Sequence, residues 1–328
     1  MKEKVLITGA SGFLGYHLIL SALENNLEVF AAVRSNSNVK HLEHLPLNFI
    51  TLDYKNTASL KQAFNEHRFQ HVIHAAGITK ANSLSDYDLV NADFTNNLAL
   101  AAETLKNDFQ RFVLISSLAA IGPEKGIENI ITEDKIPAPV TAYGKSKLKA
   151  ENCLKKIEIS STILRPTAIY GPRERDLFLI SNYLNKGFEP YIGKAPQKLS
   201  FVYAKDVADV AVNALRLNNA NGAYNITDGF DYNKYDFADI IKNYLGKKTL
   251  KIYLPVSLVK LILFAVEKIS IPLNKIPAVN NEKLNELMAE NWSCDIKKAT
   301  TELNFQPKYN LKDGLIETLK WYKENNWL

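Results

Sequence analysis

Residues 5–15 read Val5-Leu6-Ile7-Thr8-Gly9-Ala10-Ser11-Gly12-Phe13-Leu14-Gly15. The first four are an apolar run typical of a buried strand, and the pattern from Gly12 to Glu24 is helical. Glycines permit a tight turn and let backbone approach a pyrophosphate, while a helix N-terminus offers free N–H groups and a positive dipole end. The spacing is G-x-x-G-x-x-G, which could also be a plain strand-to-helix turn. Its position at the first strand-to-helix junction predicts a dinucleotide-binding loop.

Short apolar runs alternate with helical patterns through the first half of the chain. Further strands are expected at residues 28–33, 48–51, 71–74 and 112–115. Continuous apolar runs of this length are typical of a parallel sheet buried on both faces. The alternation predicts an α/β fold, a Rossmann-type doubly wound parallel sheet with right-handed crossovers.

The second half is expected to divide between this sheet and a smaller lobe. A strand at 200–203, a helix at 206–217 and a strand at 223–226 are expected to return to the Rossmann sheet. A tail helix is expected at 311–324. The predicted domains are an NAD(P)-binding Rossmann domain of residues 1–168 with 199–227, and a mostly C-terminal substrate-binding lobe of residues 169–198 with 228–328.

Composition excludes several classes of function. The 328 residues are 46% hydrophobic and 23% charged, with a net charge of +5, and the lysines are scattered, so nucleic acid is not an expected partner. Cys153 and Cys294 lie far apart, which argues against disulfides and fits a reducing compartment. His71 and His74 have no cysteine or acidic companions, so no metal site is expected.

The N-terminus has no signal-like apolar region, and the apolar stretch 258–266 is shorter than the roughly 20 residues that span a bilayer. We therefore expect a cytoplasmic protein without stable membrane insertion. The helix expected from about residue 254 to 266 is apolar on most faces, which favours packing in a core. An apolar substrate pocket and contact with a membrane surface are the alternatives.

The end of the second strand bears on cofactor choice. Rossmann sites usually place an acid there, which binds the ribose hydroxyls of NAD. This chain has Arg34 instead, and the planar guanidinium of arginine suits a 2′-phosphate. The sequence favours NADP(H), with NAD(H) as the alternative; an exposed arginine at a strand end is the structural alternative.

Two further motifs carry chemistry. Tyr143 and Lys147 form a Y-x-x-x-K motif near an expected helix start, one turn apart on one face. A neighbouring ammonium favours the phenolate and lowers the pKa of the tyrosine, so that proton exchange with a carbinol or carbonyl oxygen becomes feasible. Ser116 and Ser117 end the fifth strand, where a hydroxyl could hold the reacting oxygen.

Together these motifs resemble an extended short-chain dehydrogenase/reductase, of the NAD-dependent epimerase/dehydratase group. The chain is also similar to the branch with 3-beta-hydroxysteroid dehydrogenases and dihydroflavonol reductases. The resemblance implies a catalytic triad of Ser117, Tyr143 and Lys147, with Ser116 as the adjacent possibility, and a structural role for Asn91. The cofactor contacts it implies, with Arg34 from the reasoning above, are Gly9, Ser11, Gly12, Phe13, Leu14, Gly15, Arg34, Asp53, Tyr54, His74, Ala75, Ala76, Gly77, Asn91, Tyr143, Lys147, Pro166, Ala168 and Ile169.

Departures from the family pattern narrow the reaction. Family dehydratases have acidic residues just after the catalytic serine or threonine, whereas Leu118, Ala119 and Ala120 follow here. Galactose epimerases have an asparagine near the R-P-x-x-x-Y stretch; here this stretch runs from Arg165 to Tyr170, and Pro166-Thr167-Ala168 supplies no asparagine. The favoured function is reversible hydride transfer between nicotinamide and a secondary alcohol or ketone, with a slight lean to a net reductase. A redox-neutral nucleotide-sugar epimerase is the alternative, and a non-catalytic NADP(H)-sensing protein a remote one.

The substrate is expected to be a small molecule. Its predicted contacts are Ser117, Ala119 and Arg173, the last as a clamp for an anionic group; an exposed loop of mixed charge is the alternative for Arg173. The resemblance also implies a homodimer through the helices beside Asn91 and Tyr143.

Overall fold

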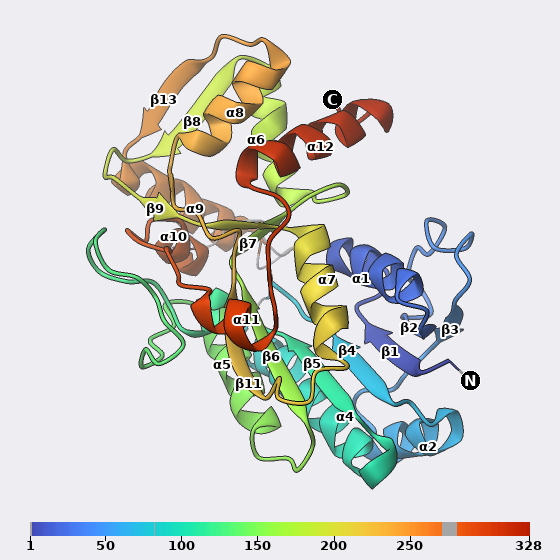
Figure 1. The fold of residues 1–328 in the computed structure, drawn as a ribbon. Coiled ribbons are helices and arrows are strands. Elements are labelled where there is room, and N and C mark those ends of the chain that lie inside the picture. The colour runs from blue at the N-terminus through green and yellow to red at the C-terminus, as the bar shows by residue number, and fades with distance from the viewer. Residues whose placement is uncertain (1, 82, 271–280) are drawn as a thin grey trace.

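The computed structural model describes residues 2–81, 83–270 and 281–328 (Figure 1). Its centre is a seven-stranded sheet in the order β11-β6-β5-β4-β1-β2-β3, with every neighbouring pair parallel. The strands are β1 (Lys4–Thr8), β2 (Glu28–Ala32), β3 (Asn48–Ile50), β4 (His71–His74), β5 (Arg111–Ile115), β6 (Ser161–Pro166) and β11 (Gly222–Ile226). The predicted α/β Rossmann-type sheet is confirmed.

Helices cover both faces of the sheet because alternate strand residues point to opposite sides. Val5 and Ile7 of β1 lie in one core cluster, to which α1 (Phe13–Glu24) and α7 (Ala204–Ala214) contribute. Leu6 lies in the other, with α2 (Thr57–His67), α4 (Phe94–Glu103) and α5 (Ala142–Leu154). The strand order reverses between β1 and β4, and ligands of such sheets bind at that point, beyond the carboxyl ends of the strands.

A smaller lobe stands over these carboxyl ends (Figure 1). Its core joins aromatic residues such as Tyr170, Phe201 and Tyr322. Its strands are the parallel pairs β7 (Ala168–Tyr170) with β10 (Phe201–Tyr203) and β8 (Phe188–Ile192) with β13 (Leu250–Leu254), and the antiparallel pair β9 (Lys198–Leu199) with β12 (Tyr232–Asn233). The helices of this part of the chain are α6 (Asp176–Asn185), α8 (Asp236–Leu245), α9 (Val256–Ser270), α10 (Asn281–Leu287), α11 (Lys297–Glu302) and α12 (Leu311–Glu324).

Two sequence-based expectations about this part are wrong. The strand at 200–203 was expected in the Rossmann sheet, but β10 pairs with β7 outside it, whereas β11 does join the large sheet. Segment 254–266 was expected in a core, but Leu258, Leu261 and Ile262 are 43%, 64% and 48% exposed. Another stripe of α9, with Val259 and Leu263, packs inward against Leu284.

Elements of the two predicted domains also interleave. Helix α11 lies beside β11 in Figure 1, and Ala299, Leu303 and Phe305 pack in the core cluster of the sheet. Among the described residues, no helix is long and apolar enough to span a membrane.

Candidate active site

The predicted phosphate loop has the close packing that its glycines allow. Gly9 has φ +69°, and a Cβ at this position would lie 2.8 Å from the Ala75 and Ala76 backbone. A Cβ at Gly15 would lie 2.2 Å from the Gly9 carbonyl oxygen. Gly12 precedes α1, and no described side chain caps this helix, so its first N–H groups are open to an anion. The loop therefore fits a pyrophosphate.

A buried hydrogen-bond chain joins the two strands at the switch point. Thr8 Oγ1 lies 2.7 Å from His74 Nδ1 and accepts a hydrogen bond from the Ala76 N–H at 3.1 Å. Burial lowers the pKa of His74 to about 3, so its imidazole is neutral. These hydrogen bonds hold the segment after β4 against the phosphate loop. Thr8 was not among the predicted site residues.

Helix α5 begins where the Y-x-x-x-K motif predicts. The Thr141 hydroxyl caps it by accepting from the Gly144 N–H at 3.1 Å. Lys147, one turn after Tyr143, is buried and donates to the Ile115 carbonyl at 3.0 Å. A Cβ at Gly144 would lie 2.3 Å from the Ala119 carbonyl oxygen, so α5 packs directly on the segment that follows Ser117. The motif is thereby positioned at the carboxyl end of β5.

The two serines after β5 have different surroundings. Ser116 is buried, and its hydroxyl donates to Glu151 Oε1 at 2.6 Å. Ser117 is half-buried; its hydroxyl accepts from the Ala119 N–H at 3.2 Å and lies close enough to the Tyr143 phenol to favour its ionised form. Of the two possibilities that the sequence left open, the geometry favours Ser117 beside the tyrosine.

The electrostatics of the motif differ from the sequence-based expectation. Burial raises the pKa of Tyr143 above its ordinary value, and the nearby Ser117 hydroxyl opposes this only in part. The Lys147 ammonium lies 6.0 Å from the tyrosine ring centroid and donates to the Ile115 carbonyl, so the net direction of the phenol pKa is set by burial. Burial also lowers the pKa of Lys147 to about 8, against the charge of Glu151, which raises it.

Asn91 ties the cofactor-lining segment to the catalytic helix. Its side chain bonds the backbone N–H and carbonyl of Ile78, at 2.8 and 3.0 Å, and donates to Ser146 Oγ at 2.9 Å. A Cβ at Gly77 would lie 3.0 Å from Asn91 Oδ1 and 3.2 Å from Lys147 Nζ. The segment therefore passes within contact distance of both side chains.

A cavity of about 610 Å³ adjoins the phosphate loop. Arg34 lines it, as the predicted cofactor contact, and Arg173 lines the same cavity with its guanidinium 4.7 Å from the Tyr16 ring centroid. Arg173 was predicted to clamp the substrate, but it lies beside the phosphate loop. The lining also includes Ser11, Gly12, Phe13, Asn36, Ser37, Asn38, His41, Glu174, Arg175, Asp176 and Trp327.

The remaining predicted residues occupy the same edge of the sheet. Asp53 follows β3 and accepts from the Lys55 N–H at 3.0 Å, while the Tyr54 ring stacks on Phe94 at 5.4 Å. Pro166 ends β6, and Ala168 and Ile169 lie in β7. Between them, the buried Thr167 hydroxyl has no partner among the described residues. An orphaned hydroxyl there fits a segment completed by a bound molecule, and the sequence reasoning did not single it out.

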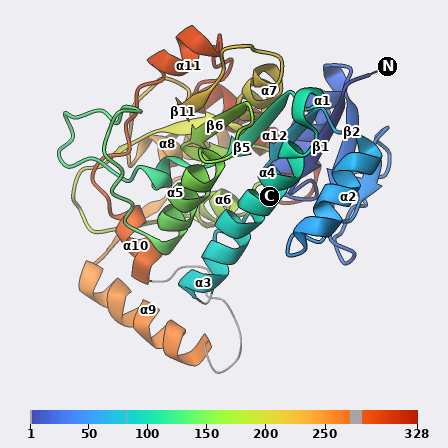
Figure 2. The ribbon, with the colours of Figure 1, turned by 90° about the horizontal axis from the view of Figure 1, so that it is seen from below.

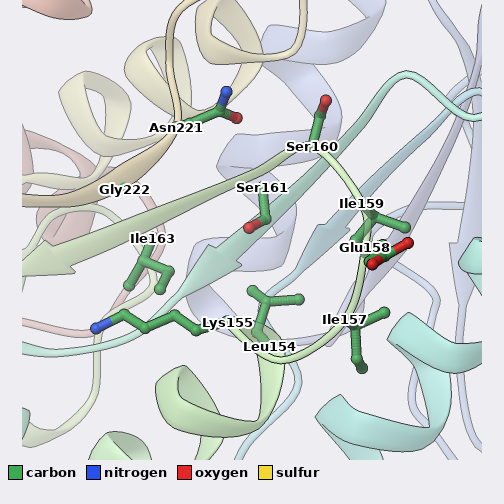
Figure 3. Close-up of a pocket in the computed structure, with 10 residues that line it drawn as sticks. All are labelled: Leu154, Lys155, Ile157, Glu158, Ile159, Ser160, Ser161, Ile163, Asn221 and Gly222. Carbon is green, nitrogen blue, oxygen red and sulfur yellow. The ribbon is translucent and has the colours of Figure 1, made fainter.

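A second cavity, of about 400 Å³, lies away from this site (Figure 3). Its walls come from the end of α5, the following turn and the first residues of β6 and β11, including Leu154, Ser161 and Gly222. This is the amino edge of the sheet, and it contains none of the predicted site residues.

Comparison with known proteins identifies the family. The model of the NAD-dependent epimerase/dehydratase family matches residues 5–227, which include the phosphate loop and the Ser-Tyr-Lys set. The chain belongs to this family. It is an enzyme of the extended short-chain dehydrogenase/reductase group that uses a nicotinamide cofactor.

Individual relatives of the family differ in reaction. The chain is 27% identical to a putative UDP-glucose 4-epimerase of Methanocaldococcus jannaschii over 98% of this chain and 99% of the relative. It is 26% identical to a ceramide reductase of Caulobacter vibrioides over 99% of this chain and 96% of the relative. The structure of a Bacillus cereus UDP-glucuronic acid 4-epimerase with UDP-glucuronic acid and NAD superposes on this chain with a TM-score of 0.77 at 26% identity. The superposition covers 98% of this chain and 99% of the epimerase chain.

The residues present fit the family's cofactor. The phosphate loop would hold the pyrophosphate of the cofactor. The Gly77 segment would line the part of the cofactor between the pyrophosphate and the nicotinamide, and Lys147 would hold the nicotinamide ribose. When bound, the nicotinamide supplies the hydride acceptor or donor and, when oxidised, a positive charge. Ser117 can orient a substrate oxygen, and Tyr143 can exchange a proton with that oxygen through its hydroxyl.

Proposed function

We propose that this enzyme transfers hydride reversibly between NADP(H) and a secondary alcohol or ketone, and that it acts as a net reductase. The observation that carries the proposal is the arrangement of Ser117 near Tyr143, with Lys147 one turn later on α5 and no acid or base in the three residues after the serine. The next three residues, Leu118, Ala119 and Ala120, are apolar and buried. This set supports proton exchange at one oxygen and offers no group for removing water from a neighbouring carbon.

The preference for NADP(H) rests on Arg34. Arg34 lines a cavity that adjoins the N-terminus of α1, where the pyrophosphate would lie, and a guanidinium there suits a 2′-phosphate. A charge-assisted hydrogen bond contributes about 1.5–3 kcal/mol, so Arg34→Asp should weaken NADPH binding by roughly tenfold to a hundredfold. Lys155→Asp makes the same charge change at the opposite edge of the sheet and serves as the control.

The alternative is a redox-neutral epimerase, which the similarity to sugar-nucleotide epimerases favours. The first test is the nucleotide released when freshly purified protein is denatured, identified by mass and absorbance. An empty site that binds and exchanges NADPH supports a net reductase. Retained NAD(H) supports the epimerase, and NADH binding tighter than NADPH and unchanged by Arg34→Asp would refute the Arg34 assignment.

The role of the tyrosine is tested separately. Tyr143→Phe removes the phenol hydroxyl but keeps the ring, so hydride turnover should fall by about 10²–10⁴ with cofactor affinity retained. Full turnover in this variant would reject the triad. Lost turnover together with lost cofactor binding would point to a structural role.

The homodimer is proposed on family resemblance. The helices that would form it, α4 and α5, lie side by side on one face of the sheet, where both contribute to one core cluster. Sedimentation equilibrium of the purified chain gives the mass directly, and a monomer at micromolar concentration would reject the proposal.

A further inference from the structure

Helix α9 has two apolar faces, and among the described residues one of them packs on the protein while the other is exposed. Val259 and Leu263, one turn apart, are each 9% exposed and contact a cluster with Leu284 of α10. Leu258, Leu261 and Ile262 follow the i, i+3, i+4 spacing of a separate helix face and are the exposed residues described above. We call these three side chains the α9 face. Figure 2 shows α9 at the margin of the molecule, outside the other helices.

This surface is unusual for a protein in water. Single exposed apolar residues are ordinary, whereas a contiguous exposed apolar face marks a contact with another molecule or a membrane. Between residues 256 and 266 the only charged residue is Lys260, which is exposed. A helix with one exposed apolar face and a lysine on its polar side matches the interfacial helices that lie in the headgroup layer of a bilayer.

Cationic and aromatic side chains continue the surface at the start of α9. Tyr191, Tyr235 and Tyr253 form one cluster, with ring centroids 5.0 Å apart for Tyr191 and Tyr235 and 5.6 Å for Tyr191 and Tyr253. Lys194 and Lys251 lie over these rings, with their ammonium nitrogens 5.5 and 4.5 Å from the centroids of Tyr253 and Tyr235.

This cluster is joined to the helix through the backbone. Two residues, Leu254 and Pro255, separate Tyr253 from Val256, the first residue of α9. A Cβ at Gly193 would lie 3.5 Å from the Cγ2 atom of Val256. The neighbouring acids are both paired with Lys242: Glu189 is buried and bonded at 2.9 Å, and Asp239 is bonded at 2.6 Å. Lys194 and Lys251 are exposed cations at this end of α9, and tyrosines with lysines are the side chains that settle at membrane interfaces.

We propose that the α9 face docks the enzyme on an anionic lipid bilayer, with Leu258, Leu261 and Ile262 among the acyl chains and Lys194 and Lys260 at the headgroups. The charge of the patch selects a bilayer over a second copy of the chain, because two copies would bring these lysines together. The docking does not depend on which reaction the enzyme catalyses.

The position of α9 would place the active site close to the lipid. Helix α10 packs against α9 through Leu284. In the same helix, Glu282 Oε2 accepts from the backbone N–H of Ala142 at 2.9 Å, directly before Tyr143. One helix therefore separates the docking surface from the catalytic helix, an arrangement that suits a substrate drawn from the bilayer.

Vesicle flotation of the full chain tests the docking without substrate or cofactor. The probes are vesicles of phosphatidylcholine alone and of phosphatidylcholine mixed with phosphatidylglycerol. The wild type should float with the mixed vesicles, and L261E/I262E should reduce partitioning at least about tenfold, since charged residues are costly at acyl-chain depth. Phe49→Glu, on β3 at the far edge of the sheet, places a carboxylate at another exposed apolar site and should float like the wild type.

A second variant tests the charge. K194E/K260E should weaken binding to the mixed vesicles by about fivefold or more per lysine, since a basic residue near an anionic surface contributes about 1 kcal/mol. Thermal unfolding of every variant checks that the fold is retained. The proposal is overturned if the wild type floats with neither kind of vesicle. It is also overturned if L261E/I262E floats with the mixed vesicles as well as the wild type does. A dimer that L261E/I262E dissociates, without vesicle binding, would assign the α9 face to a second copy instead.

Discussion

Glu151 offers the sharpest test of what holds the catalytic groups in place. It lies one helix turn after Lys147, fully buried, and bonds Arg165 through Nε at 3.0 Å and Nη2 at 2.6 Å. Its Oε1 also accepts from Ser116 at 2.6 Å. The carboxylate thus links α5 to the ends of β5 and β6, and Ser116 is the chain neighbour of Ser117. We predict that Glu151→Leu destabilises the protein strongly.

The magnitude follows from the three hydrogen bonds. At about 1.5 kcal/mol for each bond to a charged group they amount to roughly 4.5 kcal/mol. This agrees with the 3–5 kcal/mol or so that is lost when one partner of a buried ion pair is removed. Arg165 is 3% exposed, so its charge would remain buried and uncompensated. Replacing both partners, as in E151L/R165M, removes that charge and should restore at least about 2 kcal/mol.

Urea unfolding of the wild type, both single variants and the double variant gives the coupling energy directly. The control is Asp88→Ala, which breaks the Lys149–Asp88 pair on the outer side of α5. That pair is 2.8 Å long with side chains 46% and 27% exposed, and its loss should cost no more than about 1 kcal/mol. If the loss of unfolding free energy in E151L/R165M equals the sum of the losses in the two single variants, the buried network is not one energetic unit and the reasoning is refuted.

Three further predictions concern the loop, the helix cap and pH. Gly9→Ala forces a side chain into a left-handed conformation 2.8 Å from backbone, so it should cost more than about 1–2 kcal/mol in urea unfolding and abolish cofactor binding by calorimetry. Thr141→Ala should lower stability by about 1 kcal/mol through loss of the α5 cap, whereas Thr141→Ser should retain it. Burial lowers the pKa of His17 to about 4, so the unfolded state binds the proton first as pH falls. Neutral His17 therefore costs no unfolding free energy above pH 6.5, whereas about 3 kcal/mol of unfolding free energy is lost by pH 4. Urea unfolding across this pH range should show a smaller loss of unfolding free energy in His17→Gln than in the wild type.

Local patterns predicted the parts of the site that are themselves local. The run from Val5 to Gly15 forms a strand, a tight turn and a helix start, each determined by neighbouring residues. The four-residue spacing of Tyr143 and Lys147 likewise sets their common face on α5. Ser116 and Ser117 could not be distinguished in this way, because the difference lies in the distant Glu151 carboxylate. Glu151 follows Lys147 by four residues, so the same spacing argument could have included it.

Long-range packing decided the elements that the sequence did not predict correctly. Residues 200–203 have the composition of a strand, but their partner is β7, and a strand pattern does not specify a partner. The hydrophobicity of α9 predicts an apolar environment, but only neighbouring elements determine whether protein supplies it. The sequence also did not show how deeply Tyr143 is buried, and this burial raises the phenol pKa against the expected effect of Lys147.

The location of Arg173 shows how the lobe contributes to the cavity beside the phosphate loop. After β7 the chain crosses to α1, where the Pro172 carbonyl lies 3.2 Å from His17 Nε2 and the Arg173 guanidinium lies over Tyr16. Trp327, near the C-terminus, lines the same cavity as Ser11. Groups from the Rossmann sheet and from the lobe therefore meet where the adenosine end of the cofactor is expected. Because a ligand that contacts two parts of a protein stabilises their association, cofactor binding should tighten the lobe over the sheet before the substrate enters.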